Sequence, residues 1–428
     1  MKNERSICAV LLMAIMFGTL PVWGGQKPNV IIIFTDDQGS VDMNIYGSTD
    51  LTTPNMDQLA RQGVRFTQFY ATGAVCVPSR VGLLTGRIPQ YGGLDGSVPL
   101  GSQVMISEEM KKAGYATAHI GKWHLNFGKH ALPNDQGFDY SFGHLDGCID
   151  NYSHFFYWSG PNRHDLWRNG REVFHNGEFF PDLMVKEAGD FMEKNKDKPF
   201  FLYFAMNAPH YPYQGTLKWL EHYSDLEYPR NLYAAWLSTM DERIGQLLKK
   251  LDDLGLRTNT IVIFQSDQGH STEIRAHGGG GNSGPYRGAK GSLYEGGLRI
   301  PAIISWPGHL PENQVRGQMA TSCDWYPTIL ELCKLPGAKQ RIDGKSLLPI
   351  LTDAEAPSAH DSFYWKHNNT WAVRQGKWKL IVSDKKTELY DIPNDPGEAT
   401  NLAAEYPAVV TQLKNTGKEY RERAVLYK

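Results

Sequence analysis

Short, continuous apolar runs followed by polar clusters are the main hydrophobic pattern of this chain. Apolar, β-branched and aromatic residues predominate in the runs 30–34, 115–120, 200–204 and 259–264, as is typical of strands covered on both faces. Stretches with a helical period separate these runs. The longest, residues 231–254, has its large apolar side chains on one stripe. This alternation predicts an α/β fold with a large mixed, mostly parallel sheet flanked by helices.

The pattern changes near residue 354. From there the chain has short apolar segments joined by tight turns, which predict antiparallel strands, and then an amphipathic stretch over residues 407–420 that predicts a helix. We therefore expect a catalytic-sized domain over residues 25–353. Residues 354–428 are expected to form a small subdomain made of an antiparallel sheet plus a helix.

Residues 1–24 have the organisation of a secretory signal peptide. Lys2 and Arg5 give a positive start, residues 7–20 are apolar, and a cleavage position is expected near Gly24. The apolar run is short for an uncleaved membrane anchor. No other stretch of the sequence is long and apolar enough to cross a bilayer. We expect a periplasmic or secreted protein with no stable membrane insertion.

The overall charge is nearly balanced. The chain has 428 residues with 44 basic and 46 acidic side chains, a formal net charge of −2, which argues against a nucleic-acid protein with a basic face. After the signal and Cys76, three cysteines remain. Cys323 and Cys333 bracket a helical stretch that would hold them about 15 Å apart, too far for a disulfide. With Cys148, they are expected to be buried thiols.

Acidic side chains follow two of the predicted strands. Asp36 and Asp37 come after the first strand, and Asp267 with Gln268 comes after the last. Parallel strands place their carboxyl ends at one edge of a sheet, where such folds bind ligands. An Asp pair beside a glycine is by itself more often a solvated turn. Two such sites at one edge instead predict an oxygen-only site for Ca²⁺ or Mg²⁺.

The two other strands also end in polar residues. Lys122 and His124 follow one, and His210 follows the other. Taken singly, each histidine is more often a packed or surface residue than a catalyst. Because all of these strand ends share one sheet edge, we expect the three side chains to lie near the carboxylates.

The sequence Cys-Val-Pro-Ser-Arg at residues 76–80 predicts an anion-receptive nucleophile site. Pro78 suits the first turn of a helix, so Cys76 is expected just before the helix N-terminus, where free N–H groups favour an anion. Arg80, about one turn on, can fold back toward Cys76. A buried free cysteine is the alternative outcome.

Residues 76–87 resemble the signature of the type I, formylglycine-dependent sulfatases of the alkaline-phosphatase-like superfamily. The likeness extends from about residue 29 to residue 402. It includes the acidic pairs, the Gly-Lys-Trp-His turn at residues 121–124, the pair Pro209-His210, and Lys290 before the Glu-Gly-Gly turn at residue 295. Gln268 departs from the pattern, because the family usually has Asn or His there.

The resemblance implies a chemistry and a set of roles. Cys76 would be oxidised to formylglycine by a formylglycine-generating maturase. One hydroxyl of the hydrated aldehyde, activated by the cation, would attack sulfur. The resemblance assigns the metal, Ca²⁺ with Mg²⁺ as the alternative, to Asp36, Asp37, Cys76, Asp267 and Gln268. In this scheme Arg80, Lys122 and Lys290 neutralise the charges of the sulfate and the nucleophile. His210, with Lys290, protonates the leaving alcohol. His124 removes the proton from the second hydroxyl.

The expected substrate is a sulfated polysaccharide or oligosaccharide. The alternatives are a small aryl sulfate, a phosphate ester, and no turnover at all, if an unmatured chain only binds carbohydrate. Specificity is expected in the loops 126–144 and 270–277 and in the turn 365–367. His130, Arg275 and His277 are the predicted sugar contacts, although a solvated loop residue is an equally frequent outcome for any one of them.

Overall fold

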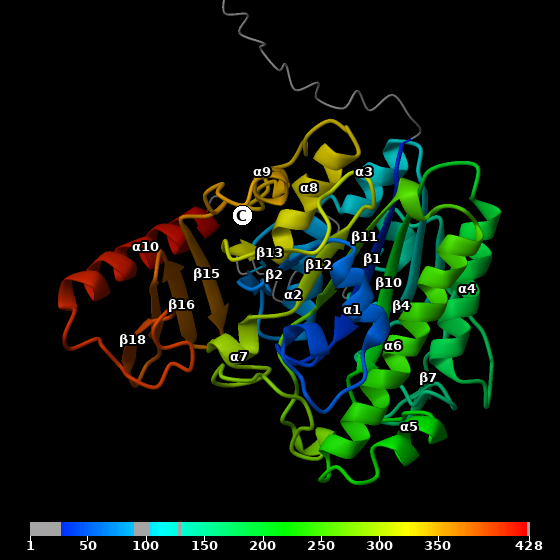
Figure 1. Ribbon diagram of the computed structural model, residues 1–428, viewed down its shortest axis with the longest axis horizontal. Coiled ribbons are helices and arrows are strands. Elements are labelled where there is room, and N and C mark those ends of the chain that lie inside the picture. The colour runs from blue at the N-terminus through cyan, green and yellow to red at the C-terminus, as the bar shows by residue number, and fades with distance from the viewer. Residues whose placement is uncertain (1–26, 90–102, 127–129, 426–428) are drawn as a thin grey trace, which may run out of the picture.

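A large mixed sheet forms the centre of the molecule (Figure 1). The computed structural model describes residues 27–89, 103–126 and 130–425. In their order across the sheet the strands are β13 (Gln314–Arg316), β2 (Val64–Phe66), β12 (Ala302–Ser305), β11 (Thr260–Ser266), β1 (Asn29–Asp36), β10 (Phe200–Pro209), β4 (Ala116–Lys122), β5 (Tyr140–His144), β8 (Trp167–Arg168) and β9 (Arg171–Glu172). From β11 to β5, neighbouring strands run parallel. The mostly parallel sheet is thus confirmed.

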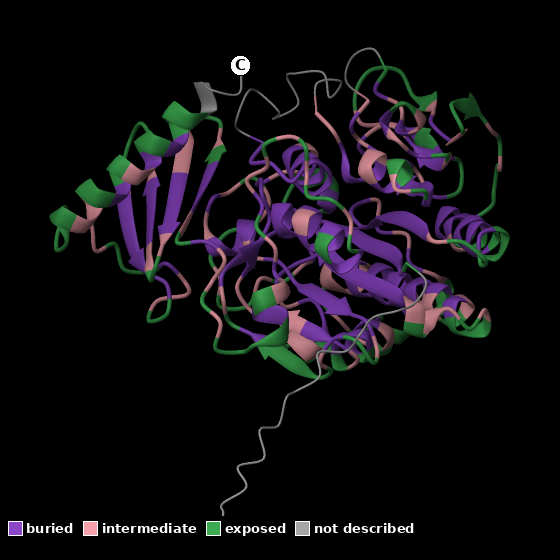
Figure 2. Cartoon of the chain, turned by 90° about the horizontal axis from the view of Figure 1, so that it is seen from above, coloured by how far each residue is buried: buried purple, intermediate pink, exposed green. Residues whose placement is uncertain are grey.

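Helices cover both faces of this sheet. In β1, Ile31 and Ile33 belong to the core on one face, and Val30, Ile32 and Phe34 to the core on the other. This explains why the strand is apolar without alternation. The first face is covered by α1 (Pro54–Arg61), α4 (Phe180–Lys194), α5 (Leu217–His222) and α6 (Arg230–Asp253). The second is covered by α2 (Cys76–Thr85), α3 (Ile106–Lys112), α8 (Trp325–Leu332) and α9 (Leu348–Thr352). Figure 2 shows the buried strands between them.

A small antiparallel sheet lies beside the large one, at the left of Figure 1. It consists, in chain order, of β15 (Ser362–His367), β16 (Thr370–Gln375), β17 (Trp378–Val382) and β18 (Thr387–Asp391). The helix α10 (Pro407–Val425) packs on it through Leu413 and Tyr420. The predicted antiparallel sheet with a helix is therefore confirmed, while the boundary at residue 354 stays a prediction.

Three charged side chains are buried where the small sheet meets the large domain. Lys379 of β17 lies 2.9 Å from a carboxylate oxygen of Glu295 and 2.9 Å from one of Glu398, and all three side chains have 0% exposure. We call Glu295, Lys379 and Glu398 the junction cluster. Tyr70 donates a hydrogen bond of 2.8 Å to Glu295. The backbone N–H of Glu295 donates to Glu398.

Short elements complete the described chain. They are β3 (Phe69–Tyr70), β6 (Phe155–Phe156), β7 (Arg163–His164), β14 (Ala320–Thr321), α7 (Glu295–Leu298), η1 (Asn44–Tyr46), η3 (Pro133–Gln136), η4 (Arg257–Asn259), η5 (Ile274–Ala276) and η6 (Ser322–Asp324).

Several boundaries differ from the sequence prediction. Cys76 is the first residue of α2 rather than the residue before it. The strands β4 and β10 extend to Lys122 and Pro209, because their parallel neighbours continue alongside. The predicted turn 365–367 is wrong, since these residues belong to β15 and the turn follows at residue 368.

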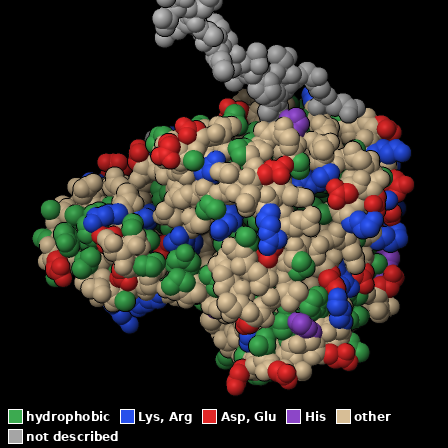
Figure 3. Space-filling model, viewed as in Figure 1, with side chains coloured by type: hydrophobic (Ala, Val, Ile, Leu, Met, Phe, Trp, Pro, Cys, Tyr) green, Lys and Arg blue, Asp and Glu red, His purple; other side chains and the backbone are tan. Residues whose placement is uncertain are grey.

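The other predictions from composition have mixed outcomes. Cys148, Cys323 and Cys333 are free and buried, as expected. Within the described residues, no helix combines the length and apolar character needed to span a membrane. Basic and acidic side chains are interspersed on the face drawn in Figure 3. The predicted signal, residues 1–24, lies outside the described residues.

Candidate active site

The carboxyl ends of β1, β4, β10 and β11 converge on one place at the edge of the sheet. β1 ends at Asp36, β4 at Lys122 and β11 just before Asp267, and His210 follows β10 directly. All of these side chains are buried, with exposures of 0–2%. The sheet edge expected from the sequence is therefore where the predicted catalytic residues meet.

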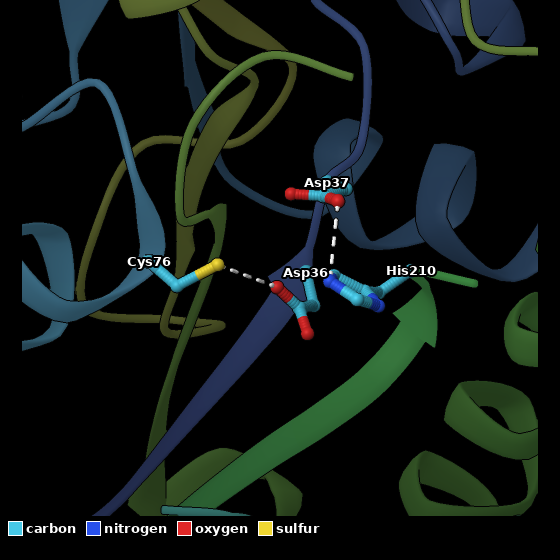
Figure 4. Close-up of side chains that lie close together, drawn as sticks. All are labelled: Asp36, Asp37, Cys76 and His210. Atoms are coloured by element: carbon cyan, nitrogen blue, oxygen red, sulfur yellow. Dashed lines mark hydrogen bonds and ion pairs between the residues drawn. The ribbon is translucent and has the colours of Figure 1, made fainter. Parts of the chain in front are cut away.

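Cys76 enters this place from the start of α2. Its Sγ lies 3.5 Å from Oδ1 of Asp36, 3.7 Å from Nζ of Lys122 and 3.7 Å from Nε2 of Gln268. Figure 4 shows the thiol pointing at Asp36, with His210 on the other side of the two aspartates. Burial raises the pKa of the Cys76 thiol, so without a bound cation it stays protonated.

Five buried charged side chains and the half-buried Lys290 lie around the thiol. We call Asp36, Asp37, Arg80, Lys122, Asp267 and Lys290 the site cluster. Nζ of Lys122 lies 2.6 Å from Asp36, and Nζ of Lys290 lies 2.8 Å from Asp37. The guanidinium of Arg80 bridges two carboxylates, at 3.6 Å from Asp36 and 3.4 Å from Asp267. Arg80 therefore acts between the aspartates as well as toward Cys76.

The three carboxylates have divergent pKa values. Burial raises the pKa of Asp36, but the positive charges of Lys122 and Arg80 outweigh it and hold that pKa well below its usual range. Burial raises the pKa of Asp37 to about 6 against the attraction of Lys290. Burial and the neighbouring Asp36 raise the pKa of Asp267. Three carboxylates in so small a volume thus favour additional positive charge.

The donor set fits a hard divalent cation. One ligand atom each from Asp36, Asp37, Cys76 and His210 can be chosen so that all lie within 4.8 Å of one another. Asp267 lies beside this group, with Oδ1 accepting the backbone N–H groups of Asp37 and Gln268 at 2.9 Å each. Oxygen-rich sets of this kind suit Ca²⁺ or Mg²⁺.

Gln268 is oriented differently from the predicted ligand. Its Nε2 donates to Asp37, while the buried Oε1 has no hydrogen-bond partner. Rotation about the last side-chain bond exchanges the two atoms, and only the hydrogen-bond network distinguishes them. An unpartnered buried acceptor beside two carboxylates supplies a further oxygen for a cation.

The two predicted catalytic histidines have free ring nitrogens. His210 has Nδ1 2.7 Å from the backbone oxygen of Tyr211, and its Nε2 lies 3.6 Å from Asp37 without a hydrogen bond. Nδ1 of the half-buried His124 is also unpartnered. Burial lowers the pKa of both rings, so neutral imidazoles, able to accept a proton, are favoured here.

Four of the ten non-glycine residues with a positive φ in the described chain are predicted site residues. Asp37 (φ 61°), His124 (φ 55°), His130 (φ 57°) and His277 (φ 56°) all adopt the left-handed region without being glycine. Such conformations cost free energy and persist where the surrounding structure requires them, most often at functional sites.

The predicted sugar contacts are only partly brought to the site. Arg275 lies over the ring of Trp158, whose centroid is 6.1 Å from that of His210. His277 lies beside Tyr213 and Tyr228. His130 is exposed, and its backbone oxygen accepts a hydrogen bond from Gln136. Within the described chain, this hydrogen bond does not connect His130 to the site cluster.

Sequence reasoning missed three residues at this site. Trp158 forms part of its wall, Tyr211 stacks on His210 at 4.1 Å, and Glu273 accepts a hydrogen bond from Tyr211 and lies 3.9 Å from Lys290. Tyr211 adjoins His210, so its position was a usable signal. Trp158 and Glu273 lie in loops without periodicity, and no local pattern singles them out.

A hollow of about 390 Å³ lies between the segment that follows Lys290 and the small sheet. Gly291 and Ser292 line one side, and His367 and Asn368 of the small sheet line the other. The residues of the site cluster do not line this hollow, and Trp365, which was expected to border the substrate, is fully buried. Nε1 of Trp365 donates to the backbone oxygen of Ala71 at 2.7 Å.

Comparison with known proteins gives a family for this constellation. The sulfatase family model matches residues 28–335, and a model for the C-terminal part of N-sulphoglucosamine sulphohydrolase matches residues 287–423. The chain is 30% identical to human N-acetylgalactosamine-6-sulfatase over 94% of its own length and 87% of the relative's. It is 30% identical to N-acetylgalactosamine-6-O-sulfatase of Bacteroides thetaiotaomicron over 93% of this chain and 94% of that one.

A solved structure agrees with these relatives. The protein called Ps i-CgsB, in complex with k-i-k-neocarrahexaose, superimposes with a TM-score of 0.84 at 29% identity, covering 92% of this chain and 93% of that one. Together with the geometry at the sheet edge, the match across most of the chain shows that it belongs to the sulfatase family and is a sulfuric ester hydrolase.

Proposed function

We propose that this chain hydrolyses sulfate esters of a polysaccharide or oligosaccharide, using a formylglycine made from Cys76 by a maturase and one divalent cation. The observation that supports this most directly is the position of Cys76. It begins α2 with its Sγ 3.5–3.7 Å from Asp36, Lys122 and Gln268. A residue so placed is next to both a cation site and a fixed positive charge, as an attack on an anionic ester requires.

The modification would supply a hydrated aldehyde whose hydroxyl attacks sulfur. Around it, Lys122 and Lys290 are placed to hold the sulfate oxygens, and Arg80 holds Asp36 and Asp267 in position. His210, with Lys290, is proposed to protonate the leaving alcohol. Because burial favours the neutral ring in the free protein, the ring would have to take up this proton once the anionic substrate is bound. His124, whose Nδ1 is unpartnered, is proposed to take up the proton released when the sulfate departs.

The cation site is assigned to Asp36, Asp37, Asp267 and Gln268, with residue 76 completing it. Ca²⁺ is the proposed ion and Mg²⁺ the alternative, because the donors are oxygens. When bound, the cation supplies Lewis-acid activation of the nucleophile. Burial and the neighbouring Asp36 raise the pKa values of Asp37 and Asp267, which supports the proposal because a bound cation would offset both effects.

The relatives support a sulfated carbohydrate substrate. The two named relatives are an N-acetylgalactosamine-6-sulfatase and an N-acetylgalactosamine-6-O-sulfatase, and the solved neighbour is in complex with k-i-k-neocarrahexaose. We propose that this chain acts on the same broad class. His130, Arg275 and His277 stay proposed sugar contacts, and export after removal of residues 1–24 is proposed from the signal-like start.

The nucleophile can be tested by intact mass and activity together. Protein expressed with a maturase is expected to be about 18 Da lighter at Cys76 than the unmodified chain, and only this form should hydrolyse a sulfate ester. Cys76→Ser, made in a host that does not modify serine, should fold and turn over no substrate. Full activity in chains that retain cysteine at residue 76 would overturn the formylglycine proposal.

The substrate class needs a separate measurement. Defined sulfated oligosaccharides should be hydrolysed with higher kcat/KM than 4-nitrophenyl sulfate. Equal or higher kcat/KM on the aryl sulfate would favour the arylsulfatase alternative, and a preference for phosphate esters would favour a phosphoesterase.

A further inference from the structure

Two side chains at the mouth of the site form a unit that the catalytic scheme does not use. They are Trp158, in the loop between β6 and β7, and Arg275, in the turn η5. The guanidinium carbon of Arg275 lies 4.8 Å from the centre of the Trp158 ring. Two residues 117 positions apart in the sequence are thus in contact. The local sequence around neither residue requires this contact.

Trp158 adjoins both proposed catalytic histidines. Its ring centroid is 6.1 Å from that of His210 and 5.9 Å from that of Tyr211. Gly147 lies between Trp158 and His124, since a Cβ added there would come within 3.0 Å of the His124 ring and 3.1 Å of Trp158. The half-buried indole is therefore a wall of the space that receives the leaving group.

The turn that bears Arg275 is fixed to the site. Glu273 accepts hydrogen bonds from Tyr211 at 3.2 Å and Ser271 at 3.1 Å, and its carboxylate lies 3.9 Å from Nζ of Lys290. The left-handed residue His277 follows the turn directly. Arg275 is thereby held at a set distance from the groups that bind sulfate.

Arg275 is exposed, and within the described residues no hydrogen bond or ion pair is formed by its guanidinium. The cations of the site cluster, by contrast, each contact a carboxylate. A guanidinium stacked on an aromatic face keeps its N–H edges free and pre-oriented for a carboxylate or sulfate. The stack thus provides positive charge beyond what one sulfate ester needs.

We propose that Arg275, positioned by Trp158, binds a second anionic group of the substrate, a carboxylate or another sulfate near the ester that is hydrolysed. This deepens the proposed function and rests on it. The substrate class is then an acidic sugar unit with at least two negative groups, rather than a singly sulfated neutral sugar. Arg275 is a binding residue and Trp158 a positioning residue.

Two matched pairs of substrates test the proposal. One is a 6-sulfated N-acetylgalactosamine–uronate disaccharide and its uronate methyl ester. The other is a galactan oligosaccharide carrying either two sulfates on adjacent sugars or one. 4-Nitrophenyl sulfate reports the core chemistry. Wild-type enzyme should prefer the more anionic member of at least one pair by about 10- to 100-fold in kcat/KM, the range expected for a charged hydrogen bond.

Arg275→Ala should remove that preference, so that both members of each pair are hydrolysed with similar kcat/KM. The matched control is Arg421→Ala, which removes a similar stack, 4.7 Å over Trp371 in the small subdomain. It should keep the preference and leave kcat/KM on 4-nitrophenyl sulfate within about twofold. Trp158→Phe should retain the preference because a ring remains, whereas Trp158→Ala should lose it. Higher salt should reduce the preference in wild-type enzyme.

The possible outcomes distinguish this proposal from the proposed function on which it rests. Equal rates on both members of both pairs, or a preference that survives Arg275→Ala, would overturn the role of Arg275. Hydrolysis of 4-nitrophenyl sulfate alone, with none of the four carbohydrates cleaved, would overturn the acidic-sugar substrate and favour the arylsulfatase alternative. If wild-type enzyme with Cys76 fully modified hydrolysed neither 4-nitrophenyl sulfate nor any of the four carbohydrates, the proposed function itself would be contradicted.

Discussion

The site cluster and the junction cluster are both buried sets of acidic and basic side chains, but their bonding differs. In the junction cluster, Lys379 contacts both carboxylates at 2.9 Å, and Tyr70 and a backbone N–H add further bonds. In the site cluster, the lysine contacts are as short, at 2.6 Å and 2.8 Å, but Arg80 lies 3.4–3.6 Å from its two carboxylates. Oε1 of Gln268 and ring nitrogens of His124 and His210 have no hydrogen bond there. In the junction cluster, Oε1 of Glu398 also lacks one, but it lies 2.9 Å from the ammonium of Lys379.

This difference indicates what each cluster is for. A buried charge is costly unless it is paired, so a set whose members bond to one another can hold two parts of a chain together. Unpartnered donors and acceptors at the same depth are costly too. They are explained when a ligand completes them. The predictions below test whether changes in the site cluster mainly affect activity and changes in the junction cluster mainly affect stability.

The largest expected effect is on activity, from Asp267→Asn. The amide keeps an oxygen for the backbone N–H groups of Asp37 and Gln268 but removes a charged metal ligand. We expect kcat/KM to fall by about 10³-fold or more. Because the pKa of Asp267 is raised by burial and Asp36, the metal-free protein should be no less stable than wild type. A large loss of stability with activity retained would contradict the comparison.

Lys379→Met should show the opposite behaviour. It leaves Glu398 buried without a cation and Glu295 with only Arg299, 3.4 Å away, and the free energy of unfolding should fall by about 3–5 kcal/mol. Enzyme that remains folded should keep its kcat/KM. Denaturant titration measures the first quantity and steady-state kinetics the second. Adding Glu295→Gln and Glu398→Gln to the same variant should recover most of the stability.

Removal of the cation should affect both quantities, but only through the site cluster. A chelator should abolish activity and lower the free energy of unfolding by about 2.7 kcal/mol relative to protein held at a hundredfold excess of Ca²⁺ over Kd. Asp267→Asn should show a much smaller shift, since it binds the ion poorly, whereas Glu398→Gln should respond as wild type does. Identical responses in all three proteins would place the ion elsewhere.

The smallest effect concerns pH and the junction cluster. Burial and Glu295 raise the pKa of Glu398 to about 7 against the attraction of Lys379, from an ordinary value of 4.5. The folded protein therefore binds a proton that the unfolded chain has lost. The resulting stabilisation is complete below about pH 4.5 and disappears as the pH rises through about 7.

Glu398→Gln should remove this dependence. Between pH 5 and 8, the free energy of unfolding of wild-type protein should fall by on the order of 1–3 kcal/mol more than that of the variant. Both are measured with chelator present, so that titration of the metal site does not contribute. Glu295 has a pKa lowered by Lys379 in spite of burial, so its opposite contribution lies below pH 4.5. Parallel curves for the two proteins would contradict the assignment to Glu398.

The sequence was sufficient for the elements that have a local signal. Apolar runs located β1, β4, β10 and β11, and the parallel-sheet rule then brought Asp36, Lys122, His210 and Asp267 together. Long-range packing decided the rest. Trp158 reaches His210 from an irregular loop, and Trp365 belongs to the core because it bonds to Ala71, 294 positions away. The hydrophobic periodicity of the sequence predicts neither contact.

The bond between Trp365 and Ala71 also affects the order in which the enzyme is completed during synthesis. Tyr70 and Ala71 lead into the loop before Cys76, and Trp365 packs on Tyr70 with ring centroids 5.4 Å apart. A ribosome has to add nearly 300 further residues after Ala71 before this support exists. Until then the segment bearing Cys76 lacks its final packing, and the proposed maturase would find it most accessible at this stage. A chain that stops short of β15 should accordingly be an inactive product.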